Sequence, residues 1–199
     1  MLCAAEPPAH TAERKAIAMK KLLLTSAGFE TAPILQCFLS LLEQPPQASK
    51  ALWIPTAAIE DGHREVLPKC RNDLRKAGFP EENVTEYNLD RPMAPEELAA
   101  YGAVYFCGGS PQHLLERIRA AEFDGVLDGA LERGLVYVGV SAGSIVAAQN
   151  LPGNLGYLNR VLEVHCDGRL PCGALPPGAV RLPNDQAVRI ADGEARIVG

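Results

Sequence analysis

Short apolar segments alternate with segments of helical periodicity over residues 21–151 of this 199-residue chain. Short apolar runs that end in small or polar residues are typical of buried parallel strands. Because such runs alternate with helical segments, the sequence predicts an α/β fold, a three-layer α/β/α sandwich with a mostly parallel sheet. Within the helix predicted over residues 63–79, Pro68 is expected to bend the helix or restart it. The predicted strands cover residues 21–28, 50–58, 83–89, 103–109 and 135–140, and the predicted helices cover residues 32–44, 63–79, 94–102, 111–134 and 143–151.

The pattern changes after residue 151, where the chain becomes rich in turns and short strands. It ends in a hairpin-like segment, AVRIADGEARIV, around Asp192-Gly193. The sequence shows neither an internal repeat nor a second domain. We therefore expect one domain over residues 19–199, preceded by a polar, poorly ordered leader over residues 1–18.

The composition favours a compact protein without nucleic-acid or membrane partners. Hydrophobic residues make up 47% of the chain, enough for one sizeable core. The net charge is −5, and Lys and Arg are scattered along the chain, which argues against nucleic-acid binding. No apolar run approaches the roughly 18 residues that cross a bilayer. Pro, Glu and His interrupt the N-terminal segment where a signal peptide is apolar, so we expect a cytoplasmic protein.

The cysteines and the glycine-rich turns indicate no metal, disulfide or nucleotide site. The six cysteines lie far apart, without a Cys-x-x-Cys pair. The LTSAG segment after the first predicted strand could line a pocket through Ser26 or Gly28, but it matches no phosphate-binding pattern. We therefore expect no metal ion and no cofactor.

The segment Gly139-Val140-Ser141-Ala142-Gly143 joins a predicted strand to a predicted helix. Gly-x-Ser-x-Gly in this context is the pattern of a nucleophile elbow, a sharp turn that exposes the serine and has no room for larger residues two positions away. The helix that follows directs its N–H groups and the positive end of its dipole towards charge that forms at the serine. A tight packing turn is the alternative interpretation. The strand-turn-helix context favours Ser141 as a nucleophile.

A nucleophilic serine needs a general base, and the chain offers four histidines: His10, His63, His113 and His165. His10 lies in the leader, and His63 lies at a helix start where we expect exposure to solvent. His113 lies in the first turn of a helix, where we expect it to point outward. His165 ends the apolar run RVLEV, and a strand end there would place it at the same edge of the sheet as Ser141. We therefore predict His165 as the general base.

Five segments occur in an order that resembles peptidase family S51, which includes the aspartyl dipeptidases (peptidase E) and the cyanophycinases. These segments are KLLLTSAG, VYFCGGSPQHLL, VYVGVSAGS, VLEVHCDG and LPNDQAVRIADGEARIVG, and they span nearly the whole of residues 19–199. The resemblance implies a serine hydrolase on a class-I glutamine-amidotransferase-like (flavodoxin-like) α/β fold. It also implies that Ser141 is the nucleophile and His165 the general base. The oxyanion hole would consist of the backbone N–H groups of Gly109 and Ala142.

The third catalytic position of the family, an acidic residue that orients the histidine, aligns with Asn184, and Asp185 is the next residue. An asparagine can hold an imidazole by a hydrogen bond, but it stabilises the imidazolium less than a carboxylate does. A shift of one residue would bring Asp185 into that position, although neighbouring side chains of an extended segment point to opposite sides. Both alternatives stay open, with a narrow preference for Asp185 in an active enzyme. Asp167 is a further candidate.

The chain departs from the family in the segments that would bind substrate. It reads CGGS where the family carries Gly-Gly-Gly-Asn, so Cys107 and Ser110 are expected to reshape the pocket without removing the Gly109 donor. Arg160 and Arg169 bracket His165 and are candidates for binding a substrate carboxylate, with ordinary surface charge as the alternative. The loop at residues 142–164 is shorter than its counterpart in the aspartyl dipeptidases. Because loops at this edge determine specificity, the resemblance implies no preference for an aspartyl residue.

We therefore expect an exo-acting serine peptidase that hydrolyses short peptides or dipeptides. The alternative is a catalytically degenerate relative that binds a small ligand or a peptide, and esterase or amidase activity on the same fold is a further option. A short peptide is the expected partner. The sequence leaves open whether the protein is a monomer or a homodimer.

Overall fold

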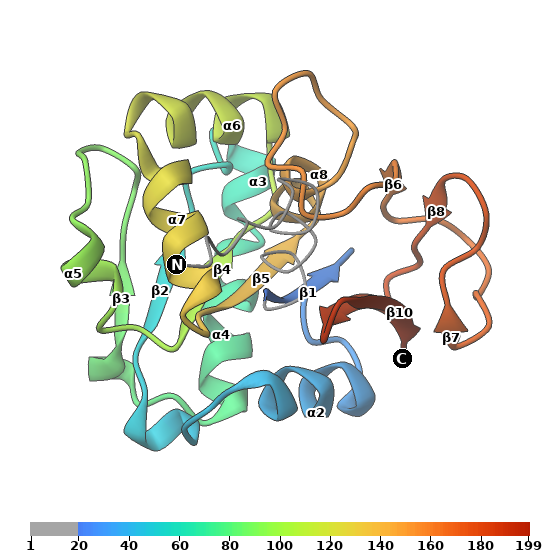
Figure 1. Ribbon diagram of the computed structural model, residues 1–199, viewed down its shortest axis with the longest axis horizontal. Coiled ribbons are helices and arrows are strands. Elements are labelled where there is room, and N and C mark those ends of the chain that lie inside the picture. Colours follow the sequence, from blue (N-terminus) through green and yellow to red (C-terminus); the bar gives the residue numbers. More distant parts are fainter. Residues whose placement is uncertain (1–19) are drawn as a thin grey trace, which may run out of the picture.

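The computed structural model describes residues 20–199, so the leader predicted at residues 1–18 lies outside the described part of the chain. The described residues form a central sheet of eight strands (Figure 1). Five neighbouring strands of this sheet are parallel, as the alternating sequence pattern predicts. In spatial order they are β3 (Val84–Glu86), β2 (Ala51–Ile54), β4 (Ala103–Phe106), β5 (Val136–Val140) and β1 (Lys21–Thr25).

Three antiparallel strands extend the sheet beyond β1. In order from β1 they are β9 (Ala187–Ala191), β10 (Glu194–Val198) and β7 (Gly173–Ala174). Strands β9 and β10 form the predicted C-terminal hairpin, and its turn residues Asp192 and Gly193 have φ of 57° and 75°. Two further strands, β6 (Leu162–Glu163) and β8 (Val180–Arg181), form a separate parallel pair.

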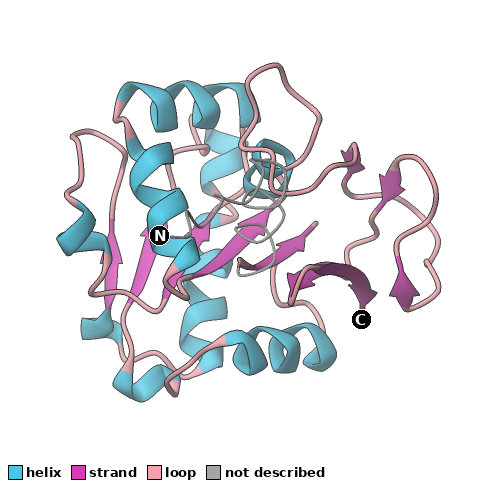
Figure 2. Ribbon diagram, viewed as in Figure 1, coloured by secondary structure: helices cyan, strands magenta, loops and turns pink. Residues whose placement is uncertain are grey.

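Helices cover both faces of the central sheet, which makes the fold the predicted three-layer α/β/α sandwich (Figure 2). Successive strand residues point to opposite faces, so Leu23 packs in one core while Leu22 and Leu24 pack in the other. The helices on the Leu23 face are α2 (Ala32–Leu41) and α4 (Leu67–Ala77). The helices on the other face are α5 (Pro95–Leu98), α6 (Pro111–Ala120), α7 (Phe123–Glu132) and α8 (Ala142–Ala147).

Two of the predicted helices are divided. The helix predicted over residues 111–134 consists of α6 and α7, because Glu122 has φ of 51° and interrupts the helical backbone. The helix predicted over residues 63–79 consists of α3 (Asp61–Arg64) and α4, and α4 restarts with Pro68 in its first turn as expected. Two 3₁₀ helices cover Pro46–Ala48 and Glu81–Asn83. No helix within residues 20–199 is long and apolar enough to cross a membrane.

A buried carboxylate connects α4 to the sheet. Asp73 is 1% exposed, and its Oδ2 accepts hydrogen bonds from the backbone N–H of Phe29 at 2.9 Å and from the hydroxyl of Tyr105 at 2.8 Å. Phe29 belongs to the loop after β1, and Tyr105 belongs to β4. Burial raises the pKa of Asp73 because it disfavours the charged form, and the two hydrogen bonds partly oppose this shift. Asp73 therefore fixes the loop after β1 at the carboxyl edge of the sheet.

We expect Asp73→Asn to keep the stability of the protein at neutral pH. Asp73→Ala should lower the free energy of unfolding by about 2–4 kcal/mol, because it leaves two buried donors unpaired. A raised pKa means that the folded protein binds the Asp73 proton more tightly than the unfolded chain does. The wild type should therefore lose stability relative to Asp73→Asn as the pH rises from about 4, the pKa in the unfolded chain, through the raised pKa. Urea unfolding over this pH range tests the sign, and a trend in the opposite direction would contradict it.

Candidate active site

Ser141 occupies a sharp turn between β5 and α8. Its φ is 47°, a conformation that costs a non-glycine residue about 1–3 kcal/mol and persists only where the surrounding structure imposes it. The N–H of Ser141 donates to the carbonyl of Thr25 at 3.0 Å, and the carbonyl of Ser141 accepts from the N–H of Ile145 at 2.9 Å. Strand β1 and the first turn of α8 therefore hold this turn from both sides.

The two glycines of the Gly-x-Ser-x-Gly segment have no room for a side chain. A Cβ atom on Gly139 would lie 2.7 Å from backbone atoms of Gly143 and Ser144. A Cβ atom on Gly143 would lie 2.6 Å from Cβ of Phe106 in β4. Side chains do not approach other atoms so closely, so the packing of α8 against β5 and β4 requires both glycines.

A second glycine-rich turn, Gly108-Gly109, follows β4 and lies against Ser141. A Cβ atom on Gly108 would be 3.4 Å from Cβ of Ser141. Gly109 has φ of 141°, and a Cβ atom there would be 2.1 Å from the carbonyl oxygen of Ala57. Within residues 20–199, neither the N–H of Gly109 nor the N–H of Ala142 donates a hydrogen bond. The described part of the chain thus leaves both sequence-predicted oxyanion donors available.

His165 contacts both Ser141 and Asn184. Its Nε2 lies 3.1 Å from Oγ of Ser141, and its Nδ1 lies 2.8 Å from Oδ1 of Asn184. Because an amide oxygen can only accept a hydrogen bond, Nδ1 carries the proton and donates it to Asn184. Nε2 is then the acceptor for the hydroxyl of Ser141. The three side chains therefore form one continuous hydrogen-bonded series.

Asp185 forms no hydrogen bond with the histidine, so of the two candidates for the third position Asn184 is the one whose side chain reaches His165. The carboxylate of Asp185 forms an ion pair with Arg169. Asn184 and Asp185 are adjacent in the turn between β8 and β9, and their side chains reach different partners. Among the hydrogen bonds of His165 within the described residues, none involves Asp167.

Ser26, directly after β1, holds the loop that carries His165. Its buried Oγ accepts a hydrogen bond from the backbone N–H of His165 at 3.3 Å and donates one to the carbonyl of Leu182 at 2.8 Å. The same carbonyl accepts from the N–H of Cys166 at 3.2 Å. His165 depends on such support because its φ is 57°. From the sequence, Ser26 is only a candidate pocket residue; its contact with His165 depends on a loop that sequence patterns do not place.

A cavity of about 470 Å³ opens beside Ser141 and His165. One wall consists of residues from the segment that contains α3 and α4, and the rest of the lining includes Ser26, Gly108 and Gly109. His63 belongs to the first wall, although the sequence favours a solvent-exposed histidine at this helix start. Within residues 20–199, no three His, Cys, Asp or Glu side chains are grouped so as to hold a metal ion. The residues of the first wall are Gly62, His63, Val66, Lys69 and Cys70.

Three residues that the sequence suggests for substrate binding do not line this cavity. Arg169 is engaged by Asp185, and Arg160 lines a separate cavity of about 230 Å³. Ser110 caps α6, because its Oγ accepts a hydrogen bond from the N–H of His113 at 3.3 Å. A role of Arg160, Arg169 and Ser110 in substrate binding stays a prediction.

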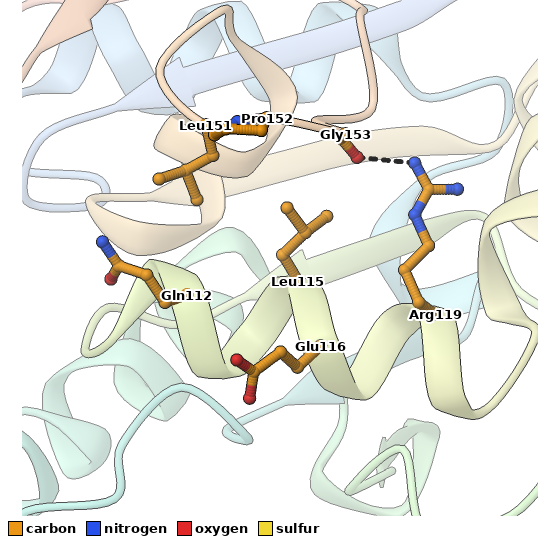
Figure 3. A pocket seen from close by; sticks show the side chains of 7 residues that line it. All are labelled: Gln112, Leu115, Glu116, Arg119, Leu151, Pro152 and Gly153. Carbon is orange, nitrogen blue, oxygen red and sulfur yellow. Dashed lines mark hydrogen bonds between the residues drawn. The ribbon is translucent and has the colours of Figure 1, made fainter.

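A larger cavity of about 590 Å³ lies between α6 and the loop after α8 (Figure 3). Leu115 and Leu151 lie on opposite sides of it, and the guanidinium of Arg119 donates to the carbonyl of Gly153 at 2.6 Å. None of its lining residues belongs to the series formed by Ser141, His165 and Asn184. The smaller cavity beside Ser141 is therefore the candidate active site.

Two solved structures share the fold of this chain. A putative peptidase E protein from Listeria monocytogenes EGD-e aligns with 90% of this chain and 98% of its own, at 18% sequence identity and a TM-score of 0.72. A peptidase from an acI-B1 actinobacterium aligns with 91% of this chain and 88% of its own, at 18% identity and a TM-score of 0.65. No curated protein matches the chain at a significant level. The fold is thus the flavodoxin-like α/β fold that the sequence predicts.

The class of protein follows from this fold together with the sequence of its parallel half. A sequence profile of peptidase family S51 matches residues 22–155, from the second residue of β1 through β5, and this range includes the Gly108-Gly109 turn and the Ser141 turn. The chain is a peptidase by family. It belongs to peptidase family S51, as the five sequence segments predict.

We expect Gly139→Ala to lower the free energy of unfolding by about 3 kcal/mol or more, because the added methyl group meets backbone atoms that cannot move aside. Gly125→Ala is the matched control. A Cβ atom on Gly125 meets nothing within 4 Å, and alanine is favoured over glycine inside a helix by up to about 1 kcal/mol. Chemical unfolding followed by circular dichroism measures both changes. Equal stabilities of Gly139→Ala and the wild type would show that the Ser141 turn does not need this glycine.

Proposed function

We propose that the chain is an exo-acting serine peptidase that hydrolyses short peptides or dipeptides, with Ser141 as the nucleophile. The observation that carries this proposal is the arrangement of His165, with Nε2 at 3.1 Å from Oγ of Ser141 and Nδ1 at 2.8 Å from Oδ1 of Asn184. A serine whose hydroxyl meets the unprotonated nitrogen of an imidazole, itself oriented by a third residue, has the arrangement of an activated nucleophile.

In the proposed reaction, Oγ of Ser141 attacks the carbonyl carbon of the scissile bond while Nε2 of His165 accepts the hydroxyl proton. The N–H groups of Gly109 and Ala142 stabilise the oxyanion, an effect worth about 3–4 kcal/mol per donor in other serine enzymes. Nε2 then returns the proton to the leaving amine, which departs and leaves an acyl-enzyme at Ser141. Water, deprotonated by the same nitrogen, hydrolyses the acyl-enzyme and regenerates the hydroxyl.

The third residue of this series, Asn184, is an uncharged amide. Its amide oxygen accepts the Nδ1 proton of His165 and thereby keeps the lone pair of Nε2 directed at Ser141. An amide carries no charge, so it stabilises the imidazolium that forms during attack less than a carboxylate would. We therefore propose an enzyme whose acylation step is limited by the third residue.

The dimensions of the cavity support a short substrate. About 470 Å³ is room for one or two residues, and the Ser141 side chain forms part of its lining. A folded protein could not place a backbone carbonyl at the base of such a cavity. Cleavage near the end of a short, flexible peptide fits the site better.

The second candidate function is a catalytically degenerate member of the family that binds a short peptide or another small ligand. The observation that favours it is again Asn184, because the histidine has no carboxylate partner among the described residues. Its binding site would be the same cavity.

We expect a fluorophosphonate probe to label the wild-type protein at Ser141. Labelling should disappear in Ser141→Ala and fall by about 10²-fold or more in His165→Ala, because the hydroxyl then has no base. Ser40→Ala and His113→Ala are matched controls, because both residues lie outside the cavity. Mass spectrometry of the labelled peptides and the labelling rate are the measurements. A correctly folded wild type that is not labelled at neutral pH would refute the peptidase and favour the binding protein.

We expect Asn184→Asp to raise kcat for a short peptide by at least about tenfold, because a carboxylate stabilises the imidazolium. Asn184→Ala should lower kcat by about 10²-fold with a small change in KM, because the imidazole then loses its fixed orientation. Asn159→Asp, which adds the same charge at an exposed asparagine, is the control for charge alone. A fall in kcat in Asn184→Asp would show that the amide itself is required.

A further inference from the structure

The strand order places the two halves of a bound substrate on opposite sides of Ser141. Strand β5, which ends at Ser141, lies between β4 and β1. The Gly108-Gly109 turn follows β4, whereas Ser26 and the His165 loop adjoin the end of β1. In the proposed function, on which this inference rests, His165 protonates the leaving amine, so the leaving group faces β1. The residue that contributes the scissile carbonyl therefore extends towards β4 and β2.

The wall on the β4 and β2 side is largely apolar. Val66 lines the cavity there together with Gly62 and the glycines of the Gly108-Gly109 turn. Val66 is 43% exposed, unusual for a valine, and it is one of three large hydrophobic residues of the described chain with such exposure. A second, Ile59, lies two residues after Ala57, whose carbonyl oxygen contacts Gly109. Apolar surface is thus left open to solvent at the side where the acyl residue would enter.

The two side chains of this wall that can carry a positive charge each have a carboxylate neighbour, whereas Nδ1 of His63 is buried with no hydrogen-bond partner within residues 20–199. The ammonium group of Lys69 forms an ion pair with the carboxylate of Glu30. The imidazole of His63 has Nε2 at 3.9 Å from a carboxylate oxygen of Glu60. A substrate carboxylate beside Lys69 would compete with Glu30 and lose part of its own hydration.

The remaining polar group of the wall, the thiol of Cys70, offers no attraction for an acid either. A hydrogen bond with Cys107 lowers the pKa of Cys70, and burial opposes this shift. A neutral thiol packs as a small hydrophobic group, and a thiolate would repel a carboxylate.

We propose that this cavity binds an uncharged, apolar side chain, of the size of leucine or methionine, on the residue that contributes the scissile carbonyl, and that it discriminates against an acidic side chain. Val66 and the Lys69–Glu30 pair are the residues that determine this specificity. Val66 supplies the apolar contact, and Glu30 keeps the charge of Lys69 from acting on the substrate.

The first test compares three substrates that differ only at this residue: leucine, asparagine and aspartate joined to 7-amino-4-methylcoumarin. Asparagine has the shape of aspartate without its charge. We expect kcat/KM to fall in the order leucine, asparagine, aspartate, with at least about tenfold between the first and the last. A value for aspartate equal to or above that for leucine would overturn the proposal.

Two pairs of variants test the residues. Val66→Arg should shift the leucine-to-aspartate ratio of kcat/KM towards aspartate by at least about tenfold, whereas Val161→Arg, at a valine that is 40% exposed outside the cavity, should leave it unchanged. Glu30→Gln should shift the ratio in the same direction by releasing Lys69. Glu43→Gln, which breaks the Lys21 pair elsewhere on the surface, is its control. An unchanged ratio in both Val66→Arg and Glu30→Gln would overturn the assignment of this wall.

A covalent measurement separates this inference from the proposed function. Diphenyl phosphonates that carry a leucine or an aspartate side chain label a nucleophilic serine, and their relative labelling rates report specificity even where turnover is slow. Faster labelling of Ser141 by the leucine compound supports the proposal, and faster labelling by the aspartate compound overturns it. If neither these compounds nor a small fluorophosphonate labels Ser141, both the peptidase and the specificity are refuted. Labelling by the fluorophosphonate together with an aspartate preference refutes the specificity alone.

Discussion

The close approach of α8 to strands β5 and β4 is the contact on which the candidate site depends. At Gly139 and Gly143 two backbone segments meet with no space for a Cβ atom, and the chain turns sharply enough to hold Ser141 at φ of 47°. Because β5 lies between β4 and β1, this turn has the Gly108-Gly109 turn on one side and Ser26 on the other. The surroundings of the serine therefore follow from the order of the parallel strands.

The histidine reaches the same edge without belonging to the central sheet. His165 follows β6, one of two short strands outside that sheet, and its loop is joined to the end of β1 by hydrogen bonds through Ser26 and the carbonyl of Leu182. Residues far apart in the sequence thus meet because the buried hydroxyl of Ser26 forms hydrogen bonds with two loops. The distance between Nε2 and the serine hydroxyl depends on these few contacts rather than on a packed helix or a long strand.

The sequence alone predicts those parts of the site that lie in or directly after helices and strands. Strand alternation and the glycines around Ser141 predict the sheet and the turn, because both depend on local patterns and on steric exclusion. The partner of His165 depends on how a turn between two strands directs Asn184 and Asp185, and no periodicity describes a turn of this kind. His63 belongs to α3 and lines the cavity with its side chain 34% exposed, a position that no sequence pattern indicates. The sequence is least informative where the chain is irregular.

The pairing of β6 with β8 has a consequence for how such a site can diversify. The two strands are parallel, with Leu162 opposite Val180 and Glu163 opposite Arg181, and they deliver His165 and Asn184 in the same direction. Strands of two residues define their register weakly, and a slip of one residue reverses which side chains face the partner. A single residue deleted between β8 and Asn184 would therefore exchange an amide for a carboxylate at the imidazole. In this fold, whether a charged or a neutral side chain contacts the general base depends on the register of these strands as well as on the residues themselves.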